Sequence, residues 1–152
     1  MDASEPFSVD TVLAPVDGSE ESAVAAEYAV AVADRYDASV HVLFVLGRGV
    51  VEGMNAGTVD EDDVAENSRR FLEDATALAE AYDVPVSTAV SHGFSPHRKT
   101  RHPGSVVLDA ADTAGADFIV IPREPMTDPT AEVLEKAAEY VLSYASQPVL
   151  SV

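Results

Sequence analysis

The stretch Thr11-Val-Leu-Ala-Pro-Val-Asp-Gly-Ser19 decides the fold of this chain. A short apolar run that ends at Asp17 and Gly18 predicts a buried strand followed by a tight turn. Ser19 then stands where a side-chain oxygen accepts a hydrogen bond from a free N–H group at a helix start. The stretch therefore predicts a strand, a turn and a helix, and the helical pattern continues from Glu20 to Tyr36.

The same alternation of strand and helix continues to the end of the chain. We predict further strands at residues 39–46, 85–91, 117–122 and 147–152. Helices are predicted at 60–82, from the N-cap Ser105 to about residue 113 with Gly115 ending it, and after the N-cap Asp128. We predict a flexible glycine loop at 47–57 and a loop at 92–103. Alternating elements of these lengths form right-handed crossover units with a parallel sheet. We expect an α/β fold over residues 1–152 as a single domain, a doubly wound five-stranded parallel sheet with helices on both faces. Ligands bind such sheets beyond the carboxyl ends of the strands.

Composition excludes several classes of protein. The chain has 152 residues and no cysteine, which excludes disulfides, thiolate metal sites and cysteine nucleophiles. No apolar run approaches the roughly 20 residues of a membrane span, and the first residues lack the pattern of a signal peptide. We therefore expect a cytoplasmic protein.

Charge is the unusual property of this sequence. The chain carries 27 Asp and Glu against 9 Lys and Arg, which gives a net charge of −18. Nucleic acids and anionic membranes repel such a chain, so we expect neither as a partner. The acids are dispersed from Asp2 to Glu139 and not gathered in a tail. This dispersal favours a halophilic protein, whose acidic surface is screened by molar salt.

Four segments together resemble the universal stress protein family. They are VLAPVDGSEES at 12–22, ASVHVLFVL at 38–46, GADFIVIP at 115–122 and AAEYVLSYASQPVLSV at 137–152. The resemblance spans nearly the whole chain in order. It implies a five-stranded α/β fold, a cytoplasmic location, frequent dimerisation and a role in the stress response without a firmly assigned reaction.

The glycine motif by which ATP-binding relatives hold phosphates is missing here. Aligned on the last helix, its two first glycines correspond to Pro122 and Pro125, its third glycine to Glu135 and its hydroxyl residue to Lys136. Proline has no N–H to donate, and only glycine lets the backbone come so close to a phosphate. Three acids stand in the same region and would repel a phosphate: Glu124, Asp128 and Glu132. We predict that ATP is not bound through the usual loop.

The positions that hold adenosine in ATP-binding relatives are better kept. By resemblance, Pro15, Asp17 and Val45 line the base and ribose, and Asp17 accepts a ribose hydroxyl. An alternative stays open, because a strand-to-helix turn needs Asp and Ser to satisfy the free N–H groups in any case. We therefore expect no bound cofactor, and the alternative hypothesis is that ATP or AMP is bound.

A basic segment, residues 92–103, is the other unusual feature. It carries Arg98, Lys99, Arg101 and three of the four histidines and no acid, so its charge is +3 while the rest of the chain carries −21. It could hold an anion, contact a partner's acidic surface or supply imidazoles to a metal. The alternative is an exposed loop that pairs with the protein's own carboxylates. We assign no metal site.

His41, inside an apolar strand, is interpreted as a core or edge residue.

Motifs of common catalytic sites are absent from the sequence. It contains no nucleophile elbow, no Walker loop, no dinucleotide fingerprint and no HExxH zinc motif.

We favour a non-catalytic stress-response protein that acts as a dimeric ligand-sensing or interaction module with an unknown protein partner. The competing hypothesis is an adenine-nucleotide-binding protein or slow ATPase whose phosphates are held by the basic 97–102 loop. The C-terminal strand, Gln147 to Val152, is expected at a sheet edge where two copies pair into a homodimer.

Overall fold

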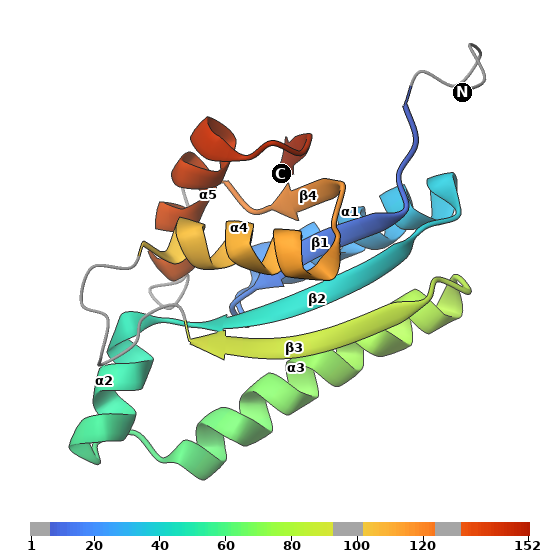
Figure 1. Ribbon diagram of the computed structural model, residues 1–152. Helices are drawn as coiled ribbons and strands as arrows, with labels where there is room; N and C mark the ends of the chain where they lie inside the picture. The colour runs from blue at the N-terminus through green and yellow to red at the C-terminus, as the bar shows by residue number, and fades with distance from the viewer. Residues whose placement is uncertain (1–6, 93–101, 124–131) are drawn as a thin grey trace.

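The computed structural model describes residues 7–92, 102–123 and 132–152. Within them, five parallel strands form one sheet in the order β3-β2-β1-β4-β5 (Figure 1). The strands are β1 (Thr11–Val16), β2 (Ser39–Leu46), β3 (Val86–His92), β4 (Phe118–Ile121) and β5 (Val149–Ser151). The helices are α1 (Glu20–Tyr36), α2 (Arg48–Ala56), α3 (Glu61–Ala81), α4 (Pro103–Ala114) and α5 (Glu132–Tyr144). The predicted α/β class and five-stranded parallel sheet are confirmed.

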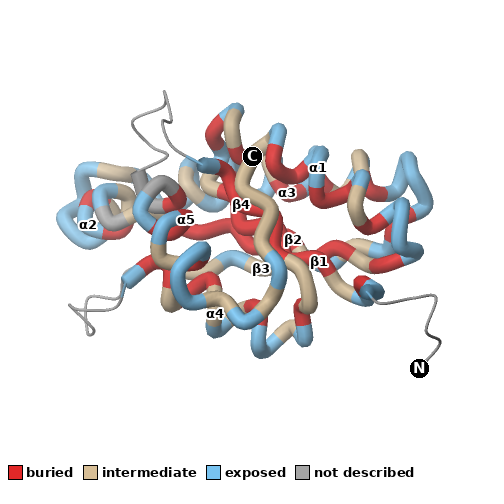
Figure 2. The backbone as a smooth tube through the Cα atoms, turned by 90° about the horizontal axis from the view of Figure 1, so that it is seen from above, coloured by how far each residue is buried: buried red, intermediate tan, exposed pale blue. Residues whose placement is uncertain are grey.

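Two cores lie on opposite faces of the sheet. Successive strand residues point to opposite faces, so Val12 and Ala14 pack with α1 and α3, whereas Leu13 packs with α4 and α5. All three are fully buried. Truncating a buried leucine such as Leu13 to alanine costs about 2–5 kcal/mol. The burial pattern in Figure 2 shows the consequence: β1, β2 and β4 are mostly buried, and exposure increases toward the sheet edges.

The predicted ends of α1 and α4 rest on single side chains and backbone angles. Ser19 is the N-cap of α1, and its Oγ accepts a hydrogen bond from the Ser22 N–H at 3.1 Å. Gly115 ends α4 in the left-handed conformation with φ 68°. Both predictions are confirmed, because they depend on local chemistry that the chain carries in one or two residues.

The prediction of a flexible loop at residues 47–57 is wrong, because most of this segment is helix α2. Its glycines serve the helix. Gly47 is the N-cap and Gly57 the left-handed C-cap, with φ 78°. Gly53 is buried, and a Cβ there would clash with the Val59 side chain. The spacing of Val50 and Met54 was the available signal of a helix.

The start of α4 also differs from the prediction. Ser105 does not cap this helix, which begins two residues earlier at Pro103. His102 is the N-cap, and its Nδ1 accepts a hydrogen bond from the Gly104 N–H at 3.0 Å. Proline fits the first helical position because its missing N–H would have no partner there. Pro103, predicted as the last residue of a loop, therefore belongs to this helix.

Candidate functional site

A cavity of about 390 Å³ lies at the carboxyl ends of β1 and β2. It contains two of the three residues that the sequence assigned to adenosine, Asp17 and Val45. Pro15 is buried within β1 and does not line the cavity. The full lining comes from the strand ends, α2 and α3: Asp17, Gly18, Phe44, Val45, Leu46, Gly47, Val50, Val64, Asn67, Arg70, Phe71 and Asp74. The topology thus brings together residues from three separate parts of the chain.

Asp17 organises the turn from β1 into α1. Its Oδ1 accepts hydrogen bonds from the Ser19 N–H at 3.0 Å and from the Ser19 hydroxyl at 2.6 Å. The backbone N–H of Asp17 donates to Ser22 Oγ at 3.3 Å. Gly18 has φ +88°, where an L side chain is strained, and its position for a Cβ lies 3.4 Å from the Phe44 ring. The Asp17 carboxylate therefore stabilises the turn, and its hydrogen bonds hold it half-buried at the cavity wall.

Helix α3 supplies residues that the sequence analysis did not assign to a site. Asn67, Arg70, Phe71 and Asp74 follow the helical spacing of three, four and seven residues and share one face. Phe71 packs edge-on against Phe44 of β2, with ring centroids 5.8 Å apart. The spacing alone suggested a core-facing stripe. That the stripe reaches the strand ends depends on how α3 lies across the sheet.

The charges in this cavity are unfavourable for a highly anionic ligand. Asp17 and Asp74 contribute two carboxylates and Arg70 one guanidinium. Arg70 is exposed and also lies 3.5 Å from Glu66 Oε1. One carboxylate 4 Å from a unit negative charge costs about 1 kcal/mol in water and about 4 at an effective dielectric constant of 20. The cavity therefore suits a neutral or weakly charged ligand better than a triphosphate.

The carboxyl end of β4 offers few backbone donors. Pro122 is buried and has no N–H, and the Arg123 N–H donates to Val152 O at 2.9 Å. The two residues that follow β4 thus present no free N–H to a phosphate. The remaining loop positions singled out in the sequence lie outside the described residues: Glu124, Pro125, Asp128 and Pro129. The same holds for Arg98, Lys99 and Arg101 of the basic segment and for the side chains of Glu132 and Glu135.

Strand β2 carries one titratable group away from this cavity. The His41 ring is partly buried, and its Nδ1 lies 2.7 Å from Ser87 Oγ on β3. Burial lowers the pKa of His41 below the usual histidine value. The interpretation of His41 as a core or edge residue is wrong, because the ring is only half-buried and β2 is an interior strand of the sheet. Nowhere in the described ranges do three His, Asp or Glu side chains gather closely enough to hold a metal ion.

Comparison with known proteins agrees with this architecture. A model of the Universal stress protein family matches residues 8–152. The chain belongs to the universal stress protein family. A universal stress protein of Methanocaldococcus jannaschii is 27% identical over 144 residues, which cover 93% of this chain and 80% of the relative.

Solved structures of the family share the fold. A universal stress protein in complex with cAMP superposes with TM-score 0.66 at 18% identity, over 96% of this chain and 98% of that one. The universal stress protein from Archaeoglobus fulgidus in complex with dAMP gives TM-score 0.61 at 18% identity, over 97% and 98%. At these identities the likeness concerns the fold.

No helix in the described part of the chain is both long and apolar enough to cross a membrane.

Proposed function

We propose that this universal stress protein is a non-catalytic ligand-sensing module that binds an adenine nucleoside or nucleoside monophosphate between β1, β2 and α3. One observation carries the proposal: Asp17 and Val45 line a single cavity of about 390 Å³ at the carboxyl ends of neighbouring strands. This is where parallel α/β sheets bind their ligands. Asp17 would accept a ribose hydroxyl, and Phe44 and Phe71 would offer apolar contacts to the base.

The proposal favours few phosphates over three. The cavity holds two carboxylates against Arg70, and the positions after β4 offer no free backbone N–H at Pro122 and Arg123. A triphosphate would meet repulsion without the donors that compensate it elsewhere. The related structures described above hold cAMP and dAMP, each with one phosphate. ATP is therefore expected to bind more weakly than adenosine or AMP, or not at all.

The competing function is an ATP-binding protein or slow ATPase. In that case Arg98, Lys99 and Arg101 replace the missing glycine loop as phosphate contacts, since guanidinium groups bind phosphate oxygens well. The observation that favours it is the sequence itself, which concentrates a charge of +3 in one segment of a chain with net charge −18. Both functions use the same adenosine end and differ in what holds the phosphates.

The assembly we propose is a cytoplasmic homodimer joined through β5, acting in the stress response. Members of the family are commonly dimeric. Strand β5 supports the proposal by its position, because it closes one edge of the sheet and its residues are only half-buried. An unpaired strand edge is a template for pairing with another chain.

Calorimetric titration with adenosine, AMP and ATP tests the ligand. We expect adenosine and AMP to bind and ATP to bind at least tenfold more weakly. Asp17→Asn should weaken adenosine and AMP alike, whereas Glu27→Gln on α1 is the control with the same loss of charge. Tight ATP binding that disappears in Arg98→Ala and Arg101→Ala would establish the competing function instead. No heat with any of the three ligands would reject an adenosine site.

A further inference from the structure

Strand β3 leaves one long edge of the sheet unpaired in the described part of the chain. It stands at one end of the strand order, and among the described residues it pairs only with β2. The Val40 N–H donates to Pro85 O at 2.9 Å. This hydrogen bond shows which residues of β3 turn their backbone groups toward β2 and which turn them away. Because successive residues of a parallel strand turn their backbone groups to opposite sides, those of Val86, Thr88 and Val90 point away from β2. Three donor and acceptor pairs thus face outward along β3.

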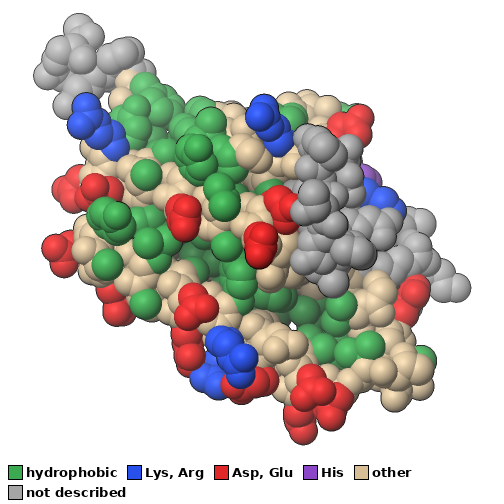
Figure 3. Space-filling view, turned by 180° about the vertical axis from the view of Figure 1, so that it is seen from behind, with side chains coloured by type: hydrophobic (Ala, Val, Ile, Leu, Met, Phe, Trp, Pro, Cys, Tyr) green, Lys and Arg blue, Asp and Glu red, His purple; other side chains and the backbone are tan. Residues whose placement is uncertain are grey.

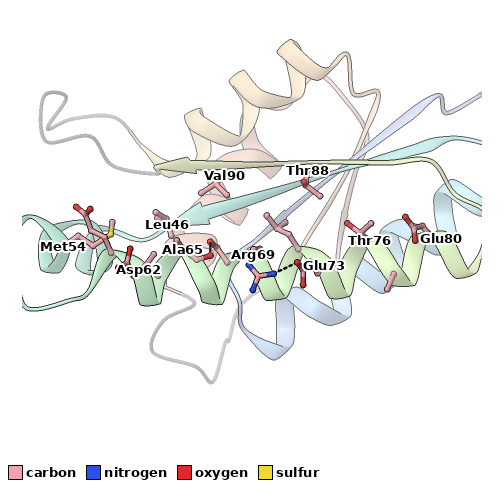
Figure 4. Close-up of a pocket in the computed structure, with 15 residues that line it drawn as sticks. Leu46, Met54, Asp62, Ala65, Arg69, Glu73, Thr76, Glu80, Thr88 and Val90 are labelled. Atoms are coloured by element: carbon pink, nitrogen blue, oxygen red, sulfur yellow. Dashed lines mark hydrogen bonds and ion pairs between the residues drawn. The ribbon is translucent and has the colours of Figure 1, made fainter.

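A groove runs beneath this edge on the α3 face of the sheet. Its volume is about 860 Å³, more than twice that of the Asp17 cavity. Thr88 and Val90 point into it from β3, and Val90 is 49% exposed (Figure 4). Its apolar lining is Leu46, Met54, Val64, Ala65, Leu72, Ala77 and Val90. An apolar groove beside a free strand edge has both elements of strand addition, backbone groups for affinity and pockets for alternate side chains.

Carboxylates surround the groove. Asp62 lies toward its α2 end, Glu73 near its middle and Glu80 toward its other end (Figure 4). Glu61, which precedes Asp62 in α3, also lines it. The cation that lines it, Arg69, is already paired with Glu73 and with Glu66, the latter at 2.6 Å. These pairs lower the pKa of the exposed Glu66 carboxyl, first by the Arg69 hydrogen bond and then by its charge. The groove therefore presents uncompensated negative charge to an incoming chain.

The opposite face of β3 is polar. A second cavity of about 640 Å³ lies there between the sheet and α4. Hydroxyl groups of Ser87, Ser91 and Thr113 line it, together with His41 and Asp109. An added strand would direct its alternate side chains toward these hydroxyl groups. Small polar residues would therefore fit at every second position.

We propose that the edge of β3 binds an extended basic segment of a partner protein as a sixth strand. The segment would place apolar side chains over the α3 groove, small polar ones on the α4 face, and Lys or Arg at both ends near Glu61 and Glu80. A second copy of this chain fits less well, because pairing β3 with β3 would bring two acidic rims together. The groove shares Leu46 and Val64 with the adenosine cavity, but the edge of β3 lies outside that cavity, and the proposal does not depend on a bound nucleoside.

The length of the groove sets the length of the probe. Glu61 and Glu80 are 19 residues apart on α3, which spans about 28 Å at ~1.5 Å per residue. Nine residues of extended chain span about 30 Å. The probe is therefore the synthetic peptide Lys-Lys-Val-Thr-Val-Thr-Val-Lys-Lys, with blocked ends and a fluorophore. Two controls are the same peptide with N-methyl groups on all of its central residues, so that neither of its edges can donate a hydrogen bond, and a version with Glu in place of Lys.

Fluorescence anisotropy and amide hydrogen exchange test the proposal at a salt concentration where circular dichroism shows the folded protein. We expect binding that slows exchange at Val86, Thr88 and Val90 and weakens as salt rises. Thr88→Pro, which removes one outward N–H, should weaken binding about tenfold, as should the pair Glu61→Gln and Glu80→Gln. Glu27→Gln on α1 should change affinity less than twofold.

Three results would overturn the proposal. The first is equal binding of the N-methylated peptides, which would show attraction without strand pairing and would hold even if Thr88→Pro failed to fold. The second is equal binding of the Glu peptide, which would remove the role of the acidic rim. The third is protection of β3 amides by self-association without peptide, which would make a second copy the occupant.

Discussion

Strand β3 closes one edge of the sheet with seven residues, whereas β5 closes the other with three. All three residues of β5 are half-buried, and three residues of β3, among them Val90, are exposed. The difference shows that the ends of one parallel sheet can be left open to different degrees. The long edge strand has a groove beneath it, whereas the side chains of the short edge strand pack in part against both cores.

Charge separates the two edges as clearly as length does. Neither strand contains Asp, Glu, Lys or Arg, but helix α3, beside β3, carries seven acidic residues against Arg69 and Arg70, whereas helix α5, beside β5, carries three against Lys136. Figure 3 shows acidic side chains spread between hydrophobic ones on the side seen from behind. An uncharged edge can pair with its own copy at little electrostatic cost, but an acidic one repels its copy. We therefore assign self-pairing to β5 and a basic partner to β3.

The largest expected effect is loss of the dimer on changing β5. Val152 N–H donates to Ile121 O at 3.1 Å, so the backbone of Ser151 points away from β4. Ser151→Pro removes that outward donor in both protomers and should weaken dimerisation roughly thirtyfold, at about 1 kcal/mol per hydrogen bond. Light scattering against concentration measures it. Ser151→Ala keeps the N–H and should remain dimeric.

Val90→Pro makes the matching change at the β3 edge and should leave the dimer intact. If Val90→Pro gives monomers and Ser151→Pro does not, the assignment of the two edges is reversed. Leu150→Lys or Leu150→Pro is the less informative test, because Leu150 packs against the α1-side core and its backbone faces β4. Its substitution would lower stability as well as change the edge.

A second prediction concerns the helices that cover the face beside β5. A Cβ on Gly104 would lie 2.5 Å from Tyr140, where α4 meets α5. Gly104→Ala should therefore lower the free energy of unfolding by about 1–3 kcal/mol, which is several degrees in Tm for a chain of this size. Amides of β5 should exchange faster while those of β3 do not. Gly49→Ala, with open space around it, is the control and should not destabilise.

Salt should act more strongly on the β3 side than on the β5 side. Self-repulsion at net charge −18 destabilises the compact state, and the Debye length falls from about 10 Å at 0.1 M salt to about 3 Å at 1 M. We expect Tm to rise with KCl, and α3 to open before α5 in hydrogen exchange at low salt. A Tm that stays flat between ~0.1 and ~2 M KCl would exclude the halophilic interpretation.

The smallest expected effect is the pH dependence that His41 adds beside β3. Burial lowers the pKa of His41 in the folded protein, so the unfolded chain binds its proton first. Stability is therefore complete above the ordinary value of about 6.5 and declines as pH falls below it. His41→Gln should flatten this part of the Tm profile between pH 7 and 5. An unchanged slope would assign the dependence to titratable groups other than His41.

The sequence by itself determined the strands, most helices and the class of fold. Ser19, Gly115 and the apolar run of β1 act through their immediate neighbours, and such local chemistry can be read without coordinates. The position of Asp17 and Val45 at strand ends was likewise predictable, because parallel strands bring their carboxyl ends together. The predictions were wrong in α2 and at the start of α4, because glycine and proline occur both in loops and at the ends of helices.

Only the tertiary structure decided what surrounds those strand ends and which edge stays open. Asn67 and Arg70 reach the Asp17 cavity because α3 crosses the sheet there, and nothing in their spacing fixes that crossing. The open groove beside Val90 depends equally on how α3 lies against β3, although β3 begins only a few residues after α3 ends. Packing between elements is set by the shape of both cores together. Local patterns determine which face of a helix is apolar, but not how closely that face meets the sheet.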